Sequence, residues 1–482
     1  MTDKKMTDKK LHRIAGSFRD PSGGVFLDEQ GRVYRTVNRC AKDVFEQVEA
    51  SGLPAALEKE GLLLPAHRED AALFFPDTGA TGVSEGGGDV VCLLSHPRIP
   101  FISYPYEWGF AQLRRASLLH LEIHRRCLMA GFTLSDATAY NIQFQGSEPI
   151  FIDRLSIVPY AEGMYWAGQK QFVEQFLAPL LLWSHTGIPP HAWYRGNLNG
   201  IAAEHVRRLL PFAGKLSLAY LSHIALPAFF ARRQQGRPLA AGRQLARQRL
   251  PKEGFLFMLR QLEKWLLGLR PPRGASFWQD YSAFRSYSAE EMRQRLDFVA
   301  AFVAGRKPAM VWDIGCNNGE FLRQALQAGA AYGVGFDIDH GALAAAYEEA
   351  AGKRLPLLPL YMDLCNPSPG LGWEQGERQG FWERRNADLL LALAVLHHIV
   401  IGNNVPLARA TDYFLNLAPA GIMEWVPKSD PMVKNMLASR EDIFPDYDIN
   451  HFRSLLQARA DIIQEKVVSA SGRTLFAYAA KR

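Results

Sequence analysis

Hydrophobic and polar positions follow two kinds of spacing in the first third of the chain. Between residues 23 and 37 the segment GGVFLDEQGRVYRTV alternates two β-rich runs about a polar Asp-Glu-Gln-Gly turn, which predicts a β-hairpin. From Phe110 to Ala130 leucine and isoleucine recur at helical spacing, and Gly131 follows, so we expect a helix that ends there. Short strands are predicted next, over 142–144 and 150–152.

The middle of the chain, from about Gln169 to Leu269, predicts a set of short helices. It is rich in Leu, Ala, Arg and Gln at helical spacing and is interrupted by prolines. A Pro-Pro-Arg-Gly linker at 271–274 follows. Ser288 and Glu291 then form a capping-box pattern, which predicts the start of a helix running to about residue 303.

From Met310 onward, strand-like apolar runs alternate with helical stretches. Such alternation predicts an α/β fold, a parallel sheet with helices on both faces. The expected strands and helices cover residues 310–314, 321–328, 332–336, 341–351, 356–362, 388–396, 407–417 and 421–426.

Composition and charge limit the classes of protein to consider. With 482 residues, 48% hydrophobic and 22% charged, the chain is expected to fold into two or three globular domains. The net charge is +6, and the stretch 207–273 is dense in arginine with only Glu253 and Glu263 as acids. This predicts a basic face, either a site for an anionic surface or a solvated helical face.

No feature of the sequence indicates export or a membrane span. The five cysteines form no CxxC pair, the start MTDKKMTDKK lacks an apolar core, and the apolar runs are too short to cross a bilayer. We therefore expect a cytoplasmic protein with a disordered leader over residues 1–15, no transmembrane segment and no bound metal.

The strongest candidate for chemistry is Asp313-Ile-Gly315-Cys316-Asn317-Asn318-Gly319, placed between a predicted strand and a predicted helix. Glycines at 315 and 319 permit a tight turn and close approach of backbone to a ligand. The next two predicted strands end near Asp337 and Asp363, so three successive strand ends carry acids. The spacing lacks the three glycines of the dinucleotide fingerprint, which disfavours NAD.

This arrangement resembles the class I S-adenosylmethionine-dependent methyltransferases, whose first motif has the form D-x-G-x-x-x-G and is followed by an acid at the second strand end. The resemblance covers about 288–478 and implies a Rossmann-like domain with S-adenosylmethionine as cofactor. It places Gly315 against the methionine moiety, Asp313 near its amino group, Asp337 on the ribose and Asp363 on the adenine edge. The full implied set of cofactor-binding residues is Asp313, Gly315, Cys316, Asn317, Gly319, Asp337, Ile338, Asp363 and Leu364.

Two places are candidates for the reacting centre. His397 and His398 follow the predicted fourth strand, where either is placed to accept a proton from an acceptor hydroxyl, or one caps a helix instead. Glu424, with Trp425 and Lys428 beside it, is the other candidate. The stretch 277–287, rich in aromatic residues, is a candidate lid.

A wider set of residues resembles a bacterial methyltransferase family that includes a nodulation protein. The residues are Asp363-Leu-Cys-Asn-Pro-Ser-Pro, Glu424-Trp-Val-Pro-Lys428, Asp430-Pro-Met432 and, in the N-terminal half, Ser103-Tyr-Pro-Tyr-Glu-Trp108. Asn366-Pro-Ser-Pro lies after the third strand and lacks the aromatic residue of DNA aminomethylases, which disfavours DNA as acceptor.

The N-terminal half carries a second pattern. Asp136-x-x-x-x-Asn141 and the strand-end Asp153 reproduce the spacing of kinase-like phosphotransferases, with Arg35 in place of the expected lysine. Leu134 stands where such proteins have a His or Tyr before the catalytic loop, and Arg154 follows the acid expected to bind metal. The sequence also has no full glycine-rich loop. We therefore expect an inactive kinase-like α+β domain.

The resulting hypothesis divides the chain into a kinase-like domain over 16–190, a helical basic connector over 191–275 and a methyltransferase domain over 276–482. Methyl transfer to an oxygen or nitrogen of a small molecule, glycan or lipid-linked precursor is the leading function. The alternatives are a regulatory module that binds the cofactor without turnover, and phosphotransfer by Asp136, Asn141 and Asp153.

Overall fold

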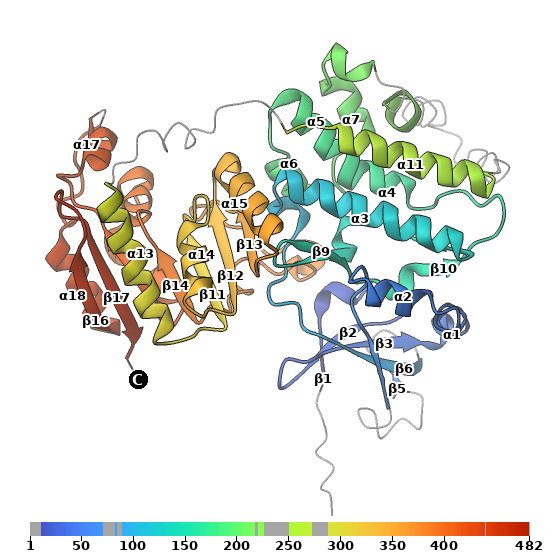
Figure 1. The fold of residues 1–482 in the computed structure, drawn as a ribbon, viewed down its shortest axis with the longest axis horizontal. Helices are drawn as coiled ribbons and strands as arrows, with labels where there is room; N and C mark the ends of the chain where they lie inside the picture. Colours follow the sequence, from blue (N-terminus) through green and yellow to red (C-terminus); the bar gives the residue numbers. More distant parts are fainter. Residues whose placement is uncertain are drawn as a thin grey trace, which may run out of the picture.

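The molecule has two halves that lie side by side (Figure 1). An N-terminal half of small sheets and helices packs against a C-terminal half built on one large sheet. The computed structural model describes residues 11–70, 82–83, 89–216, 220–225, 250–271, 288–438 and 440–481.

The predicted hairpin is confirmed as β2 (Val25–Asp28) and β3 (Val33–Asn38), antiparallel to each other. Asp28 closes its turn by accepting hydrogen bonds from the backbone N–H groups of Gln30 and Arg32. The hairpin belongs to a sheet in the order β1-β2-β3-β6-β4, with β5 paired to β6. The other strands of this sheet are β1 (Leu11–Arg13), β4 (His67–Glu69), β5 (Gly82–Val83) and β6 (Asp89–His96).

The prediction of a disordered leader over 1–15 is wrong for its last five residues. Residues 11–13 form β1, which pairs with β2, and a 3-10 turn begins at Ala15. The charged repeat dominates the composition of the first ten residues, but Leu11 packs against a small apolar cluster of the sheet. Residues 1–10 lie outside the described residues.

The predicted long helix is confirmed as α3 (Phe110–Met129), which ends one residue before Ala130. The predicted strands after it are β8 (Ile142–Gln145) and β9 (Glu148–Phe151), a hairpin. The remaining elements of this part are α1 (Lys42–Ala50), α2 (Leu53–Lys59), β7 (Phe132–Leu134) and β10 (Ile157–Pro159).

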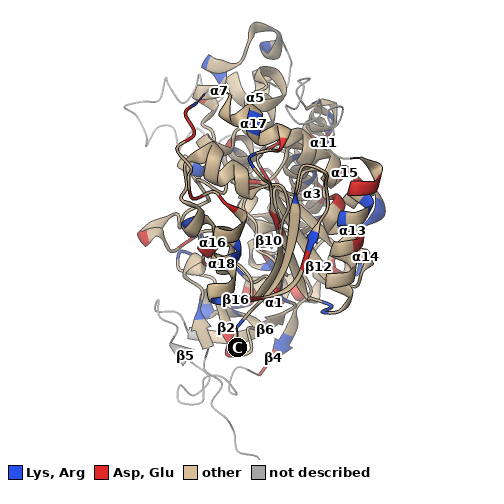
Figure 2. Ribbon diagram, turned by 90° about the vertical axis from the view of Figure 1, so that its left-hand side faces the viewer, with Lys and Arg blue, Asp and Glu red and all other residues tan. Residues whose placement is uncertain are grey.

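Where the structure describes it, the middle of the chain is helical as predicted, and its α11 packs along α3. Its helices are α4 (Gln169–Phe172), α5 (Ala178–Thr186), α6 (His191–Gly196), α7 (Ala203–Leu209) and α11 (Lys252–Gly268). In the described part of the predicted basic face, Arg207 and Arg208 both pair with Glu204. Figure 2 shows Lys and Arg intermixed with Asp and Glu over the ribbon. The arginines between 226 and 249 lie outside the described residues.

The C-terminal half is an α/β domain on a seven-stranded sheet in the order β13-β12-β11-β14-β15-β17-β16. The predicted parallel sheet is confirmed from β11 to β15, and at one edge two strands that were not predicted, β16 and β17, add to it, with β17 antiparallel to both of its neighbours. These last two strands form a hairpin, and a short loop suffices for an antiparallel pair whereas a parallel pair needs a crossover. The strands are β11 (Met310–Ile314), β12 (Tyr332–Asp337), β13 (Leu357–Tyr361), β14 (Leu389–Ala392), β15 (Ala420–Trp425), β16 (Ala460–Val467) and β17 (Thr474–Ala480).

The helices of this half cover both faces of the sheet. Along β11, Val311 faces one apolar cluster with α13 and α14, while Trp312 and Ile314 face the other, as the alternation of side chains along a strand requires. The capping box of Ser288 and Glu291 is confirmed at the start of α13. The helices are α13 (Ala289–Ala304), α14 (Glu320–Gln327), α15 (His340–Lys353), α16 (Leu407–Leu415), α17 (Pro431–Leu437) and α18 (Ile449–Arg459).

The N-terminal half completes the core of the large sheet. The ring of Phe101 lies 5.6 Å from that of Trp312 and 5.9 Å from that of Phe336, both edge to face. Beside them the buried Arg384 donates to the buried Glu107, with Nη1 and Oε2 2.9 Å apart. Because one sheet face is closed by residues from the other half, the two halves share one interior.

Candidate active site

The glycine-rich turn after β11 places backbone at the mouth of a cavity. Gly315 has φ +72°, a conformation that L side chains rarely adopt, and a Cβ there would lie 3.4 Å from the side chain of Val395. The N–H groups of Gly315 and Cys316 donate to the carbonyl of Phe336 at the end of β12. The turn is thereby tied to the neighbouring strand and lies open on its other side.

Asp337 is the last residue of β12, and Asp363 follows β13. The Asp337 carboxylate accepts hydrogen bonds from the N–H groups of Asn317, at 2.7 Å, and Asp339, at 2.9 Å. Burial raises the pKa of Asp337 above its usual value, and these backbone donors lower it in part. Asp363 is half-buried and accepts a bond from the N–H of Cys365.

A cavity of about 380 Å³ opens where these strand ends meet. The order of the sheet reverses here, between β11 and β14, which is the place where open α/β sheets bind ligands. Seven of the nine predicted cofactor residues line it: Gly315, Cys316, Asn317, Asp337, Ile338, Asp363 and Leu364.

The other two predicted cofactor residues, Asp313 and Gly319, do not line the cavity. Asp313 is 1% exposed within β11, and its Oδ2 has no hydrogen-bond partner among the described residues. Burial together with Asp337 raises its pKa well above the usual value. Gly319, at φ +76°, is the residue before α14 and faces the interior near Ala346. Asp313 therefore lies beneath the turn, and Gly319 allows α14 to start.

Both predicted histidines line the cavity, and their rings lie 4.1 Å apart. They follow β14 and the left-handed residue Ala394, at φ +54°. Burial lowers the pKa of His398, and burial, His398 and Arg295 lower that of His397 well below its usual value. The Nδ1 atom of His397 is buried and has no hydrogen-bond partner in the part of the chain that the structure describes. Burial therefore favours the neutral form of both rings.

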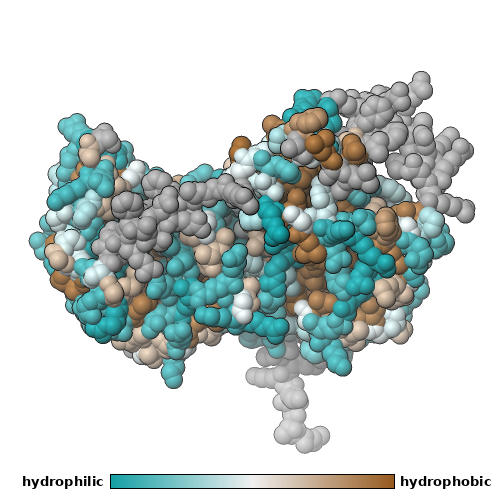
Figure 3. Space-filling view, turned by 45° about the horizontal axis from the view of Figure 1, so that its top comes forward, coloured by the Kyte–Doolittle hydropathy of each residue, from teal (hydrophilic) through white to brown (hydrophobic). Residues whose placement is uncertain are grey.

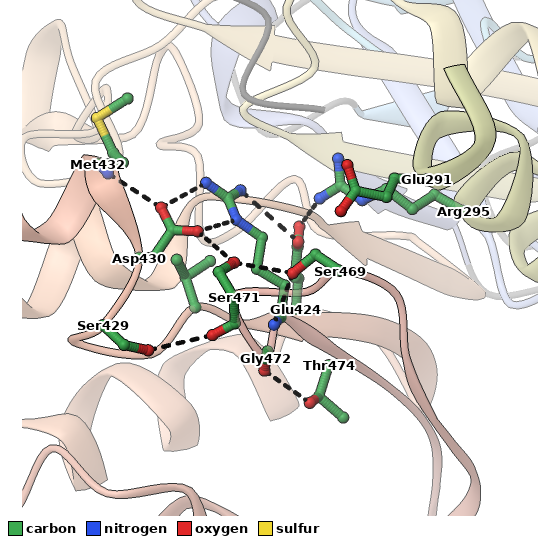
Figure 4. Close-up of polar contacts among 12 residues, drawn as sticks. Glu291, Arg295, Glu424, Ser429, Asp430, Met432, Ser469, Ser471, Gly472 and Thr474 are labelled. Carbon is green, nitrogen blue, oxygen red and sulfur yellow. Dashed lines mark hydrogen bonds and ion pairs between the residues drawn. The ribbon is translucent and has the colours of Figure 1, made fainter. Parts of the chain in front are cut away.

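A chain of four buried charges runs beside the cavity (Figure 4). Arg473 donates to both oxygens of Asp430, at 2.7 and 2.8 Å, and its Nη1 lies 3.8 Å from Oε1 of Glu424. The other oxygen of Glu424 accepts from Arg295. Arg295 and Arg473 line the cavity, whereas Glu424 lies behind them. Ser471 and Ser469 extend the network along the loop before β17.

The structure thus places the predicted candidate Glu424 away from the cavity, with none of its side chain exposed. Its neighbours are also engaged elsewhere, because Trp425 stacks on Tyr447 and Lys428 pairs with Asp442. Glu424 compensates the charge of buried arginines. Its position at a strand end is equally compatible with contact with substrate, so the sequence could not distinguish the two roles. The candidate lid at 277–287 lies outside the described residues.

Arg295, Arg473 and Asn403 line the cavity although the sequence did not indicate them. Arg295 comes from α13, before the glycine-rich motif, and Arg473 follows β16, far after it. They come from elements that flank the βαβ units rather than from strand ends, so neither spacing nor motif could have identified them.

The N-terminal pattern also comes together in space. Asn141 Nδ2 donates to Asp136 at 2.8 Å and to Asp153 at 3.2 Å. The Arg35 guanidinium, on β3, lies 2.9 Å from Asp153 and 2.6 Å from Asp20. Burial and the carboxylates of Asp153 and Asp20 raise the pKa of Asp136 to about 7.

The described residues offer neither a metal site nor a membrane-spanning helix. They contain no group of three or more His, Cys, Asp or Glu side chains arranged to hold a metal ion. None of their helices is long and apolar enough to cross a membrane.

Among solved structures, three similar ones each match about two fifths of the chain. Magnesium protoporphyrin IX methyltransferase from Synechocystis PCC 6803 with bound SAH is 18% identical, with a TM-score of 0.30 over 40% of this chain and 84% of its own. N-methyltransferase NodS from Bradyrhizobium japonicum WM9 is 12% identical, with a TM-score of 0.30 over 40% and 99%. WbdD with a kinase inhibitor is 19% identical, with a TM-score of 0.29 over 43% of each chain. Similarities of this size add no argument to the geometry above.

The similarity in sequence is much stronger. No protein-family model matches the chain. The nodulation protein NoeA of Rhizobium meliloti (strain 1021) is 44% identical over 483 residues, which cover 98% of this chain and 99% of that protein. Such identity over the full length includes both halves and the junction between them. The chain belongs to the family of the nodulation protein NoeA.

Proposed function

We propose that the C-terminal half binds S-adenosylmethionine and transfers its methyl group to an oxygen or nitrogen of a small molecule, a glycan or a lipid-linked precursor. The observation that supports this most is the convergence of the Gly315 turn, Asp337 and Asp363 on one cavity at the reversal of strand order. When bound, this cofactor supplies a methyl group that its sulfonium has already activated.

The residues around the cavity fit such a cofactor. Both oxygens of Asp337 hold one backbone N–H and keep a lone pair each for ribose hydroxyls. Gly315 lets backbone approach the amino-acid end, whereas Asp313 lies buried beneath that turn and does not line the cavity. Asp363 and Leu364 lie at the edge expected for adenine.

His398 and His397 are the residues we propose for the acceptor side. Burial favours the neutral form of both rings, and the neutral ring is the form that accepts a proton from a hydroxyl or ammonium group. The buried position of His397, only 1% exposed, also excludes water from this end of the cavity.

Isothermal titration with S-adenosylmethionine tests the binding. The wild type and an Asp297→Ala control, which removes an exposed acid of α13, should bind the cofactor. Asp337→Ala should bind it at least about tenfold more weakly, because two lost hydrogen bonds are worth more than 1.4 kcal/mol. No binding by the wild type, or equal binding by Asp337→Ala, would contradict the proposal.

Incubation of purified protein with labelled methyl donor and cell extract tests the transfer. Label should enter a small molecule or glycan fraction with the wild type and not with Gly315→Arg, whose side chain would fill the turn. Cofactor binding without any labelled product would instead favour a regulatory module that senses the cofactor.

A second candidate function follows from the N-terminal cluster. Because Asn141 bridges Asp136 and Asp153 beneath a hairpin that carries Arg35, a kinase-like domain over 16–190 is our proposal for this part. The helical connector would then cover 191–275 and the methyltransferase domain 276–482. Phosphotransfer is disfavoured, because the Arg35 guanidinium already pairs with the carboxylate of Asp153.

Magnesium-dependent binding of ATP decides between an active and an inactive N-terminal domain. A fluorescent ATP analogue should show no magnesium-dependent binding to the wild type. Binding that disappears in Asp153→Asn would establish the phosphotransferase alternative.

A further inference from the structure

Four polar groups lie buried without hydrogen-bond partners at the junction of the two halves. The phenol oxygens of Tyr106, Tyr140 and Tyr194 have none among the described residues, and neither does Nε of Arg378. Tyr194 is completely buried and Tyr106 is 2% exposed. More than about nine in ten buried polar groups in native proteins are hydrogen-bonded, so four such groups in one place are available to bind a ligand.

These four groups belong to one cluster. The ring of Tyr104 lies 5.3 Å from that of Tyr106 and 6.4 Å from that of Tyr140, and the guanidinium carbon of Arg378 lies 4.3 Å from the Tyr140 ring centre. Tyr194 lies near these side chains. Burial, together with the phenols of Tyr140 and Tyr106, raises its pKa well above the usual value.

The cluster is assembled from four separate segments. Tyr106 lies in the 3-10 turn Pro105–Glu107, inside the Ser103–Trp108 motif, and Tyr140 lies in the loop of Asp136 and Asn141. Tyr194 is on α6, and Arg378 lies in the long connection from β13 to β14. A site of this kind exists only when the two halves are packed together.

The charge of the cluster is positive. Among the described residues, Arg378 takes part in no ion pair, while the two nearby acids are already compensated, Glu107 by Arg384 and Glu377 by Arg19. The Nη1 atom of Arg378 donates to the carbonyl of Glu377 at 2.8 Å. The remaining donors are therefore a guanidinium and phenol hydroxyls, which together suit an oxyanion with several acceptor oxygens.

We propose that this junction binds a phosphate group, held by Arg378 and the hydroxyls of Tyr106, Tyr140 and Tyr194. A phosphate offers more acceptor oxygens than a carboxylate and so matches a cluster of four donors better. The group is either inorganic phosphate or the phosphoester of a small molecule. The site does not depend on methyl transfer.

The position of this site connects it to the cofactor cavity. The connection that carries Arg378 begins with Asp363, Leu364 and Cys365 of the cavity wall. Arg195, the residue after Tyr194 on α6, donates to the carbonyl of the nearby Asn366 at 3.0 Å. A phosphate bound at the junction would hold this connection against α6.

Thermal unfolding of the full chain in increasing inorganic phosphate, at ionic strength held constant with chloride, tests the proposal. Phosphate should raise the Tm of the wild type and of two controls: Arg385→Gln, an arginine of the same connection stacked on Trp382, and Tyr165→Phe, an exposed tyrosine. Arg378→Gln and Tyr194→Phe should need at least about tenfold more phosphate for the same shift.

The tyrosine variant separates a ligand site from simple packing. If the cluster holds no anion, Tyr194→Phe removes a buried unpartnered hydroxyl, so it should unfold at the same or a higher temperature and phosphate should act equally on every variant. That result would overturn the proposal. A parallel titration with a sugar phosphate distinguishes the two sources, because a phosphoester ligand should act at a lower concentration than the free ion.

Discussion

The two halves of the molecule each bring acids together at a loop, and the two groups differ in what faces them. In the C-terminal half, Asp337 faces a cavity and holds only backbone N–H groups. In the N-terminal half, Asp153 is held by Asn141 and by the Arg35 guanidinium. A carboxylate that accepts only backbone N–H groups can still bind a ligand. The charge of a carboxylate paired with a guanidinium is already neutralised.

The spacing of acids in the sequence therefore does not by itself identify a site that can bind a ligand. Both sets of acids matched a motif in the sequence, and in both the structure brings the residues together. What separates them is one side chain on β3, Arg35, and the open space above the Gly315 turn.

The largest effect is expected where the halves are joined. Arg384→Ala leaves the buried carboxylate of Glu107 without its partner and should lower the free energy of unfolding by about 3–5 kcal/mol. Chemical denaturation measures it, with Arg385→Ala as the exposed control. If the halves were independent, the cofactor affinity of the folded variant would not change. We expect this affinity to fall, because Arg384 lies on the connection that starts at the cavity wall.

The same substitution at the two acids should have opposite outcomes for cofactor binding. Asp337→Asn should weaken the binding of S-adenosylmethionine about 10- to 100-fold, since a charged acceptor is lost at the cavity. Asp153→Asn should leave this affinity unchanged within about twofold. Calorimetric titration of both variants measures this, and equal losses would remove the distinction drawn between the two sites.

The N-terminal acids should make stability depend on pH. The folded pKa of Asp136 is about 7 against a usual 3.8, so the folded chain retains a proton that the unfolded chain releases. This contribution favours folding least above pH 7 and most below pH 4. Asp136→Asn should therefore raise the unfolding free energy by about 1–3 kcal/mol at pH 8, by less at pH 5 and hardly at pH 3.5.

The matched control for this pH series is Asp297→Asn on exposed α13, which should change stability by less than about 0.5 kcal/mol at each pH. A gain for Asp136→Asn that is constant across the series would show that burial of the carboxylate is not its cause.

The smallest effect is expected at the adenine edge of the cavity. Asp363 is half-buried and holds one backbone N–H, so Asp363→Ala should weaken cofactor binding only about three- to tenfold. Titration with adenosine separates this contact from the rest, because the loss should appear equally for adenosine and for the whole cofactor. A larger loss for the cofactor alone would place Asp363 at its amino-acid end.

Prediction from sequence succeeded where local spacing determines structure. The hairpin at β2 and β3, the long helix α3, the capping box before α13 and the βαβ units from β11 to β15 all follow from patterns within about 20 residues. The turn of Gly315 and the acid at Asp337 belong to these units, and their convergence follows from the common edge of parallel strands.

Prediction failed or was silent where distant segments meet. Figure 3 shows apolar side chains at the surface among the helices of the N-terminal half; exposed ones include Leu209 and Phe212. Helical spacing predicts an apolar face but not which parts of it are covered. In the same way, no pattern indicated that Arg295 and Arg473 would meet at the cavity or that Glu424 would lie behind them.

The sequence by itself determined the α/β character of the C-terminal half, the position of the Gly315 turn and the acids at the strand ends, because each depends on neighbours along the chain. Only the tertiary structure decided that Glu424 compensates buried charge, that Arg35 occupies the N-terminal acids and that three tyrosines and Arg378 cluster between the halves. Such features depend on which side chains are desolvated together, and desolvation is a property of the packed molecule.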